Sequence, residues 1–263
     1  MNTENIACIT TFRQENLTGL VEKTRAEVFL DTAEKMARVN LPLTVVYTET
    51  KRFILDTLRG LGMNLVPQRS SGMGNIRREA FVAALRAFPK AKYLCWLEPE
   101  KPGMVQFVAP MAHRMEQERS VLGMFNRTSM ASYPPEQAYY YLFCRAVATQ
   151  LIGCDIDYAF GPMMMTRSAS SYFLNYQGEY GDTWDCILIP RLRIMNNGDG
   201  ISVLPVNFRN DPRMTQVESG NVVMMLKRLE QLNNVIPSLV SEWRKLREAR
   251  GSERKSSAII ATS

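Results

Sequence analysis

A regular alternation of short β-type runs and helical stretches is the feature of this sequence that most restricts its fold. Strands that are separated by helices pair in parallel through crossover connections, and the helices then cover the faces of the sheet. The first half therefore predicts an α/β fold with a mostly parallel sheet. Strands are expected at residues 6–11, 43–48, 64–66 and 93–97, and helices at 20–39, 52–61 and 77–88.

The second half continues this alternation less regularly, so a mixed sheet is expected. Further helices are expected at residues 105–118, 136–152, 185–195 and 221–249, and further strands at 121–125, 158–166 and 201–206. No repeat and no linker interrupts the pattern. We expect one domain over residues 1–239, followed by a basic helix end and flexible tail over residues 240–263.

The composition excludes several classes of protein. With 46% hydrophobic and 22% charged residues, the chain resembles neither a disordered protein nor a coiled coil. It has no apolar run of 18 residues, and its first residues lack the pattern of a signal peptide, so a cytoplasmic location is expected. The five cysteines are widely spaced and suggest buried apolar side chains rather than disulfides or a zinc site.

The sequence contains a single histidine, His113, in a stretch with an amphipathic helical pattern. One histidine excludes a multi-histidine metal site, and we interpret His113 as a surface or packing residue. Catalysis by this chain would therefore depend on carboxylates, arginines and backbone amides.

The formal net charge of +6 has two interpretations. It could mark a surface for nucleic acid or an anionic membrane, or a pocket for a phosphorylated ligand. Residues 240–263 carry six basic and three acidic residues, so half of the surplus lies in the tail. We therefore expect no nucleic-acid partner, and we keep weak contact between the tail and an anionic membrane surface as an alternative.

The most informative motif combines a glycine turn, an arginine and two carboxylates. Gly72 and Gly74 precede the helix that carries Arg77, and Glu98 and Glu100 directly follow the next buried strand. Glycines let backbone amides approach an anion, and arginine binds phosphate through several donors. Two carboxylates after a strand can bind a hard divalent cation. The pair Asp155 and Asp157 offers an alternative, but it follows a helix end.

This order of motifs resembles the family-2-like glycosyltransferases of the GT-A fold, the nucleotide-diphospho-sugar transferases. Gly74, Arg77 and Ala80 match the glycine-rich turn and arginine-containing helix of that family. Residues 94–97 match its buried strand, and Glu98-Pro99-Glu100 takes the place of its Asp-x-Asp motif. The resemblance implies a single Rossmann-like domain of the GT-A kind.

The second half carries the resemblance further, to about residue 210. Gly161 falls on the segment that contacts the acceptor in the family, and Asp182 and Asp185 precede Arg191-Leu192 as the family's acidic residues do. The resemblance implies that Asp185 is the general base, with Asp182 as the alternative.

The resemblance implies transfer of a sugar from a nucleotide-diphosphate sugar to an acceptor hydroxyl, with the acceptor left open. It assigns a divalent cation, Mn²⁺ or Mg²⁺, to Glu98 and Glu100. The donor would be bound by Arg13, Glu49, Gly74, Arg77 and Glu98. Two alternatives remain: a non-catalytic binding or scaffold protein of the same fold, and a basic protein that binds a membrane surface or nucleic acid.

Overall fold

The computed structural model describes residues 3–13 and 19–260, with side chains described up to residue 250. The described residues form one seven-stranded sheet in the order β3-β2-β1-β4-β6-β5-β7. The strands are β1 (Ile6–Arg13), β2 (Leu43–Thr48), β3 (Asn64–Pro67), β4 (Tyr93–Trp96), β5 (Leu122–Arg127), β6 (Met163–Thr166) and β7 (Ile201–Val206).

The sheet is mixed, because one of its strands runs against its neighbours. β1 pairs in parallel with both β2 and β4, and β3 continues the parallel half beyond β2. β6 lies antiparallel between β4 and β5, and β7 pairs in parallel with β5 at the far edge. The expected α/β fold with a mostly parallel, mixed sheet is confirmed.

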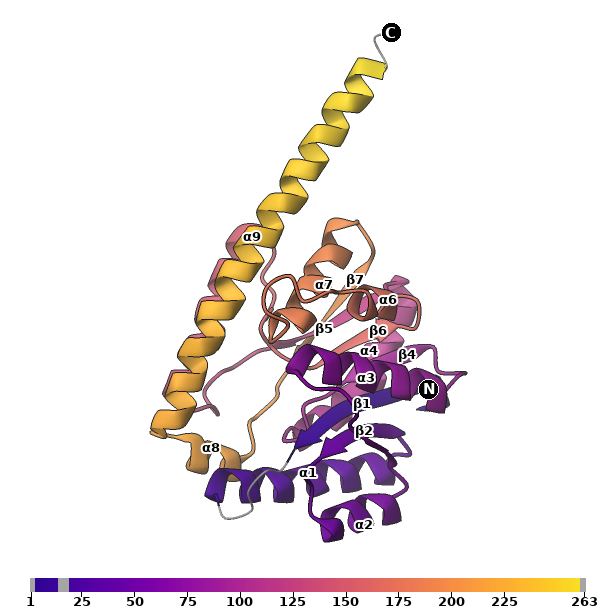
Figure 1. Ribbon diagram of the computed structural model, residues 1–263, viewed down its shortest axis with the longest axis vertical. Coiled ribbons are helices and arrows are strands. Elements are labelled where there is room, and N and C mark those ends of the chain that lie inside the picture. The colour runs from indigo at the N-terminus through magenta and orange to yellow at the C-terminus, as the bar shows by residue number, and fades with distance from the viewer. Residues whose placement is uncertain (1–2, 14–18, 261–263) are drawn as a thin grey trace.

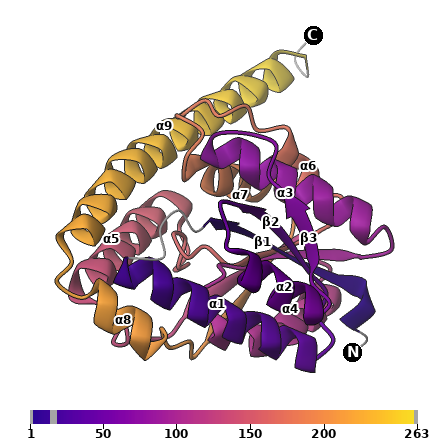
Figure 2. The same ribbon diagram turned by 60° about the horizontal axis from the view of Figure 1, so that its bottom comes forward.

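Helices cover both faces of the sheet (Figures 1 and 2). They are α1 (Leu20–Arg38), α2 (Arg52–Gly60), α3 (Met73–Ala87), α4 (Val105–Glu118), α5 (Pro135–Ile152), α6 (Ser170–Leu174), α7 (Asp185–Asn196), α8 (Pro212–Glu218) and α9 (Val222–Ile260), with short 3-10 turns η1 (Thr3–Asn5) and η2 (Pro102–Met104). The strand expected over residues 158–166 is shorter, because residues 154–162 form turns and irregular chain before β6 begins.

Aromatic pairs on either side of the sheet anchor these helices to it. Phe12 of β1 packs on Phe29 of α1, with ring centroids 4.6 Å apart. Across the sheet, Phe81 of α3 packs on Trp96 of β4 at 5.8 Å and on Phe173 of α6 at 5.4 Å. Burial of such large apolar side chains fixes the helices and hence the ends of the central strands.

α9 packs on α5 and α7 and then continues past the body of the molecule (Figure 1). Glu242 of α9 is buried and accepts from Arg193 Nε at 2.6 Å and from the Tyr180 hydroxyl at 3.0 Å. The boundary expected after residue 239 therefore falls inside a continuous helix, and the first part of the expected tail is packed on the domain. The flexibility expected for residues 240–263 stays a prediction.

The fold also bears on the expectations for membrane spans, for His113 and for the cysteines. Over the part of the chain that the structure describes, no helix is long and apolar enough to cross a membrane. His113 is exposed on α4, as expected for a surface residue, and four of the five cysteines are buried and unpaired, with only Cys154 exposed.

Candidate functional site

A pocket of about 290 Å³ opens where β1 and β4 end. From β1 the chain crosses to β2 on one side, whereas from β4 it crosses to β5 on the other side, beyond β6 in the sheet. The carboxyl ends of these strands therefore meet at a topological switch point, which is where α/β sheets usually bind ligands. The ends of β1 and β4, the start of α1, and α5, α7 and α9 all contribute to the wall.

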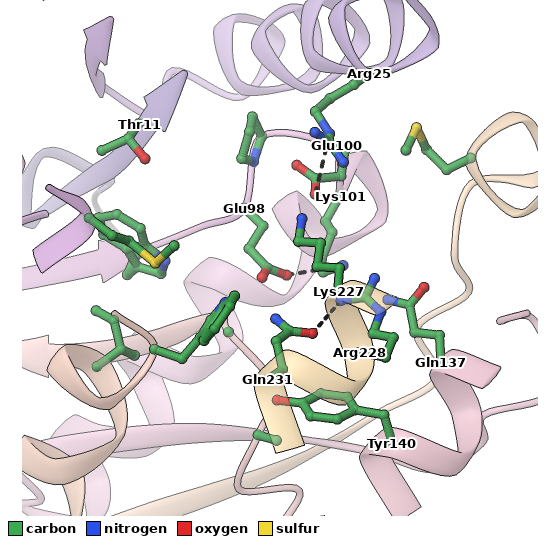
Figure 3. A pocket seen from close by; sticks show the side chains of 18 of the residues that line it. Thr11, Arg25, Glu98, Glu100, Lys101, Gln137, Tyr140, Lys227, Arg228 and Gln231 are labelled. Atoms are coloured by element: carbon green, nitrogen blue, oxygen red, sulfur yellow. Dashed lines mark hydrogen bonds and ion pairs between the residues drawn. The ribbon is translucent and has the colours of Figure 1, made fainter. Parts of the chain in front are cut away.

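The wall carries more basic than acidic side chains. It includes three carboxylates, from Glu98, Glu100 and Glu218, and six basic groups, from Arg13, Arg25, Arg77, Lys101, Lys227 and Arg228. A surplus of positive charge in a concave, partly apolar wall favours an anionic ligand. We call four of these residues, which come together from α1, the loop after β4 and α9, the basic cluster: Arg25, Lys101, Lys227 and Arg228 (Figure 3).

The loop after β4 carries two carboxylates, Glu98 and Glu100, and one residue of the basic cluster, Lys101. Lys101 is buried, and its Nζ lies 3.0 Å from Glu98 Oε2. The hydroxyl of Thr32 on α1 donates to the Pro99 carbonyl at 2.6 Å and so fixes the loop to α1. Burial acts to lower the pKa of Lys101, but Glu98 and the other acidic groups around it raise that pKa well above its ordinary value. Lys101 is therefore a permanent cation.

Arg25 connects the loop to the helices that close the pocket. Its Nε lies 3.9 Å from Glu100 Oε1, and its Nη2 lies 3.7 Å from Glu218 Oε1 of α8. Burial acts to raise the pKa of Glu100, but Arg25, Lys101 and Lys227 outweigh it and leave that pKa below its usual value. Glu100 is therefore ionised near neutral pH.

α9 supplies the other half of the basic cluster from its first turns. Arg228 Nη1 donates to Gln231 Oε1 at 2.7 Å, and its Nη2 lies 4.0 Å from Glu218. Burial and the neighbouring charges of Arg25 and Arg228 lower the pKa of Lys227. Among the described residues, the buried Nε donors of Arg25 and Arg228 have no hydrogen-bond acceptor.

Glu98 lies against a glycine that leaves room for its carboxylate. A Cβ on Gly161 would lie 2.5 Å from Glu98 Oε1, so any other residue there would displace the carboxylate. The Gly161 carbonyl accepts from Nη2 of Arg191 at 2.6 Å, and the same buried guanidinium holds the carbonyls of Tyr158 and Phe160. Gly161 and Glu98 thus form one fixed part of the pocket wall. The resemblance found in the sequence also assigns both residues to the site.

Arg77 lines the pocket and also fixes the loop before α7. Its Nη1 donates to the Thr183 carbonyl at 2.9 Å, and its guanidinium lies 5.8 Å from the Trp96 ring centroid. Gly74 does not line the pocket. A Cβ there would lie 1.9 Å from Asp182 Oδ1, so Gly74 makes space for the ion pair between Asp182 and Arg78 at 2.5 Å.

The structure places the two expected general bases outside the pocket wall. Asp185 is fully buried. Its Oδ2 accepts from the Tyr176 hydroxyl at 2.5 Å, and its Oδ1 accepts from the Thr183 amide at 2.7 Å. Asp182 is engaged with Arg78. Both carboxylates hold the loop that presents Trp184 to the pocket, and a role as general base stays a prediction.

Arg13 and Glu49 are brought together at the rim. Arg13 Nε lies 3.2 Å from Glu49 Oε2, and both side chains are more than half exposed. Arg13 lines the pocket, whereas Glu49 reaches it only through this ion pair.

The alternative acidic pair, Asp155 and Asp157, binds arginines of its own. Asp157 is completely buried against Arg127, with Oδ1 2.9 Å from Nη2, and Asp155 pairs with Arg145. Neither lines the pocket, so this pair does not form a cation site together.

The residues present do not fit a divalent cation between Glu98 and Glu100. Among the described residues, no three cysteine, histidine or acidic side chains are grouped closely enough to hold a metal ion. Glu98 is already paired with Lys101, and Glu100 faces Arg25. A divalent cation placed there would meet ammonium and guanidinium groups instead of additional oxygen ligands.

Sequence reasoning did not find the basic cluster. Lys101 directly follows the acidic motif, which was a usable signal, because a lysine three residues after Glu98 can turn back to it. Lys227 and Arg228 have the pattern of a charged helix, and only the packing of α9 beside α5 brings them to the loop after β4 (Figure 2).

Comparison with known proteins agrees with this architecture. No protein-family model and no curated protein sequence matches the chain. The structure resembles glucosyl-3-phosphoglycerate synthase from Mycobacterium tuberculosis in complex with Mn²⁺, uridine diphosphate and phosphoglyceric acid, with a TM-score of 0.60 and 12% identity over 91% of this chain and 78% of that one. A second crystal structure of that enzyme matches with a TM-score of 0.57 and 13% identity, over 90% and 80% of the chains.

A third structure of the synthase, which contains Mn²⁺, uridine-diphosphate-glucose and phosphoglyceric acid, matches with a TM-score of 0.56 and 11% identity over 85% and 79% of the two chains. Together these similarities show a GT-A-like glycosyltransferase fold, as the sequence motifs implied.

Proposed function

We propose that this protein transfers a sugar from a nucleotide-diphosphate sugar to an acceptor hydroxyl. The observation that carries the proposal is the position of the basic cluster at the switch point between β1 and β4. A diphosphate needs concentrated positive charge and fixed donors, and the pocket supplies both. The fold is shared with an enzyme crystallised with uridine diphosphate, which supports the same class of donor here.

The remaining lining suits the rest of such a donor. Trp96 and Trp184 present aromatic surface beside Arg77, while Tyr140 and Gln137 of α5 offer hydroxyl and amide groups. Aromatic rings with polar neighbours bind bases and sugars by stacking and by hydrogen bonds. The acceptor would enter from the open side of this wall.

In the proposed reaction the bond between the anomeric carbon and the β-phosphate oxygen breaks, and its electron pair stays on the departing nucleoside diphosphate. The acceptor oxygen forms the new bond to that carbon, and its proton passes to a base. The basic cluster faces the position where charge develops on the diphosphate, so it stabilises the leaving group. Asp185 contributes by fixing residues 182–185, and through them Trp184 and the carbonyl that Arg77 binds.

Release of nucleoside diphosphate from a panel of UDP-, GDP- and ADP-sugars, with water or an added hydroxyl compound taking the sugar, tests this proposal. Arg25→Gln removes a basic group from the wall, and we expect it to lower the release rate about 100-fold. Arg145→Gln is the matched control, because Arg145 pairs with Asp155 outside the pocket. Equal rates for Arg25→Gln and the unmodified protein, or no release from any donor, would contradict the proposal; nucleotide binding without release would indicate a non-catalytic protein of the same fold.

A further inference from the structure

We propose that the basic cluster binds the diphosphate directly, without a divalent cation, and that Lys227 supplies the central positive charge between the two carboxylates. This inference rests on the proposed function, because it concerns how the same pocket binds its donor. It departs from the expectation that Glu98 and Glu100 bind Mn²⁺ or Mg²⁺.

The first argument is the position of Lys227. Its side chain extends from α9 toward the space bordered by Glu98 and Glu100 (Figure 3). Burial, Arg25 and Arg228 lower the pKa of Lys227 overall, while Glu100 and Glu218 act in the opposite direction. An ammonium group at this place offers positive charge to a diphosphate and neutralises the carboxylates around it, as a bound cation would.

The second argument is that both carboxylates already have basic partners. Lys101 Nζ lies 3.0 Å from Glu98, and Arg25 Nε lies 3.9 Å from Glu100. A divalent cation prefers several oxygen ligands, and its approach here would be opposed by the charges of the basic cluster.

The third argument comes from donors that lack acceptors. Nε of Arg25 and Nε of Arg228 are buried, and within the described residues neither has a hydrogen-bond acceptor. Buried donors in native proteins nearly always have partners. Phosphate oxygens would satisfy such donors.

The fourth argument is the charge of the wall as a whole. Burial and the neighbouring charges of Arg25 and Arg228 lower the pKa of Lys227, which is unfavourable for folding. The wall holds several cations that repel one another. An anionic ligand would relieve this repulsion when it binds, which explains why the cations are retained.

Isothermal titration with UDP and with GDP, each in excess EDTA and again in excess Mn²⁺, tests the inference. We expect similar dissociation constants in both conditions, within about twofold. Lys227→Met should weaken binding of the preferred nucleotide about tenfold or more, because it removes one charged contact with the diphosphate. Lys245→Met is the matched control, since Lys245 lies on the same helix but stacks over Tyr180 outside the pocket.

Glu100→Gln should change nucleotide affinity in opposite directions, depending on whether Glu100 binds a metal ion or only pairs with Arg25. If Glu100 were a metal ligand, this change would weaken nucleotide binding in Mn²⁺. We expect equal or tighter binding, because the change releases Arg25 and removes a negative charge from beside the diphosphate. Binding that requires Mn²⁺ and is lost in Glu100→Gln would overturn the inference while leaving the proposed function intact. Absence of nucleotide binding in both conditions would instead contradict the proposed function.

Discussion

At the scale of single residues, the site is defined by charges that the fold brings together at some energetic cost. Lys227 is the clearest case, because burial and two neighbouring arginines lower its pKa. A lysine whose pKa is lower in the folded state than in the unfolded chain makes the protein less stable when it is protonated. The charge of Lys227 therefore costs stability in the folded protein, and the proposed binding of an anionic ligand accounts for its retention at this position.

This reasoning predicts a change in stability as well as in binding. Lys227→Met should increase the free energy of unfolding by about 1 kcal/mol at neutral pH, because a methionine there has no charge to desolvate. The advantage should shrink as the pH rises from the lowered pKa of Lys227 toward 10.5, because the lysine of the unmodified protein then becomes neutral in both states. Urea unfolding at several pH values measures it, and a Lys227→Met protein that is less stable at pH 7 would contradict this account.

Asp185, which the resemblance assigns as general base, also makes several structural hydrogen bonds. It is fully buried and accepts hydrogen bonds from Tyr176 and from the amides of Asp182 and Thr183. We expect Asp185→Asn to lower the free energy of unfolding by about 2 kcal/mol, because hydrogen bonds to a buried charge are weakened. Urea unfolding and the release assay are measured side by side. A large loss of kcat with unchanged stability would instead support the general-base role that the sequence suggested.

At the scale of elements, α9 supplies part of the pocket wall that the strands of the sheet do not form. The described part of α9 is fixed by Glu242, which binds Arg193 of α7 and the hydroxyl of Tyr180. Asn234 adds a hydrogen bond to the Tyr180 carbonyl at 2.9 Å. The register of these contacts determines where Lys227 and Arg228 meet the loop after β4.

Loosening this attachment should affect both stability and dynamics. Glu242→Gln should lower the free energy of unfolding by about 2 kcal/mol, because it weakens a buried, charge-assisted contact with Arg193. Hydrogen exchange over residues 222–249 should accelerate at the same time. Glu248→Gln, at an exposed position on the same helix, is the control. Equal exchange in the two variants would show that Glu242 does not fix α9.

Most elements were predictable from the sequence because they are encoded locally. The strand at Leu43–Thr48 and the helix at Val105–Glu118 begin and end where the apolar periodicity changes. α6 and α8 were not expected, since five and seven residues carry too little periodicity. α3 begins at Met73 rather than Arg77, because the glycine turn closes directly into the helix and Gly72 takes a positive φ of 83°.

The site was predictable only where it follows a strand. Arg13 ends β1 and Glu98 closely follows β4, so the sheet alone brings these two to one edge, and Arg77 reaches the same pocket from the first turns of α3. Arg25 lies about 200 residues before the adjacent pair Lys227 and Arg228 in the sequence, and only the packing of α1, α8 and α9 brings them together. No local pattern encodes such a contact, so the sequence predicts a metal site at the acidic pair without indicating its basic partners from α1 and α9.

At the scale of the whole molecule, we propose that the nucleotide binds in one pocket, whose wall includes the first turns of α9. The structure offers another open cavity, lined in part by Leu142, Arg145 and Asp155 on the outer side of α5. That cavity is remote from the loop after β4 in sequence and shares no lining residue with the pocket. Locating the bound nucleotide on the molecule therefore tests the account most directly.

Hydrogen–deuterium exchange with and without the nucleotide that binds most tightly is the decisive measurement. We expect slower exchange at the end of β1, in residues 96–101 and in residues 222–231, because the nucleotide would join these three segments. Protection confined to residues 142–155, or no change in any of the three segments at saturating nucleotide, would contradict the proposal that this pocket binds the sugar donor.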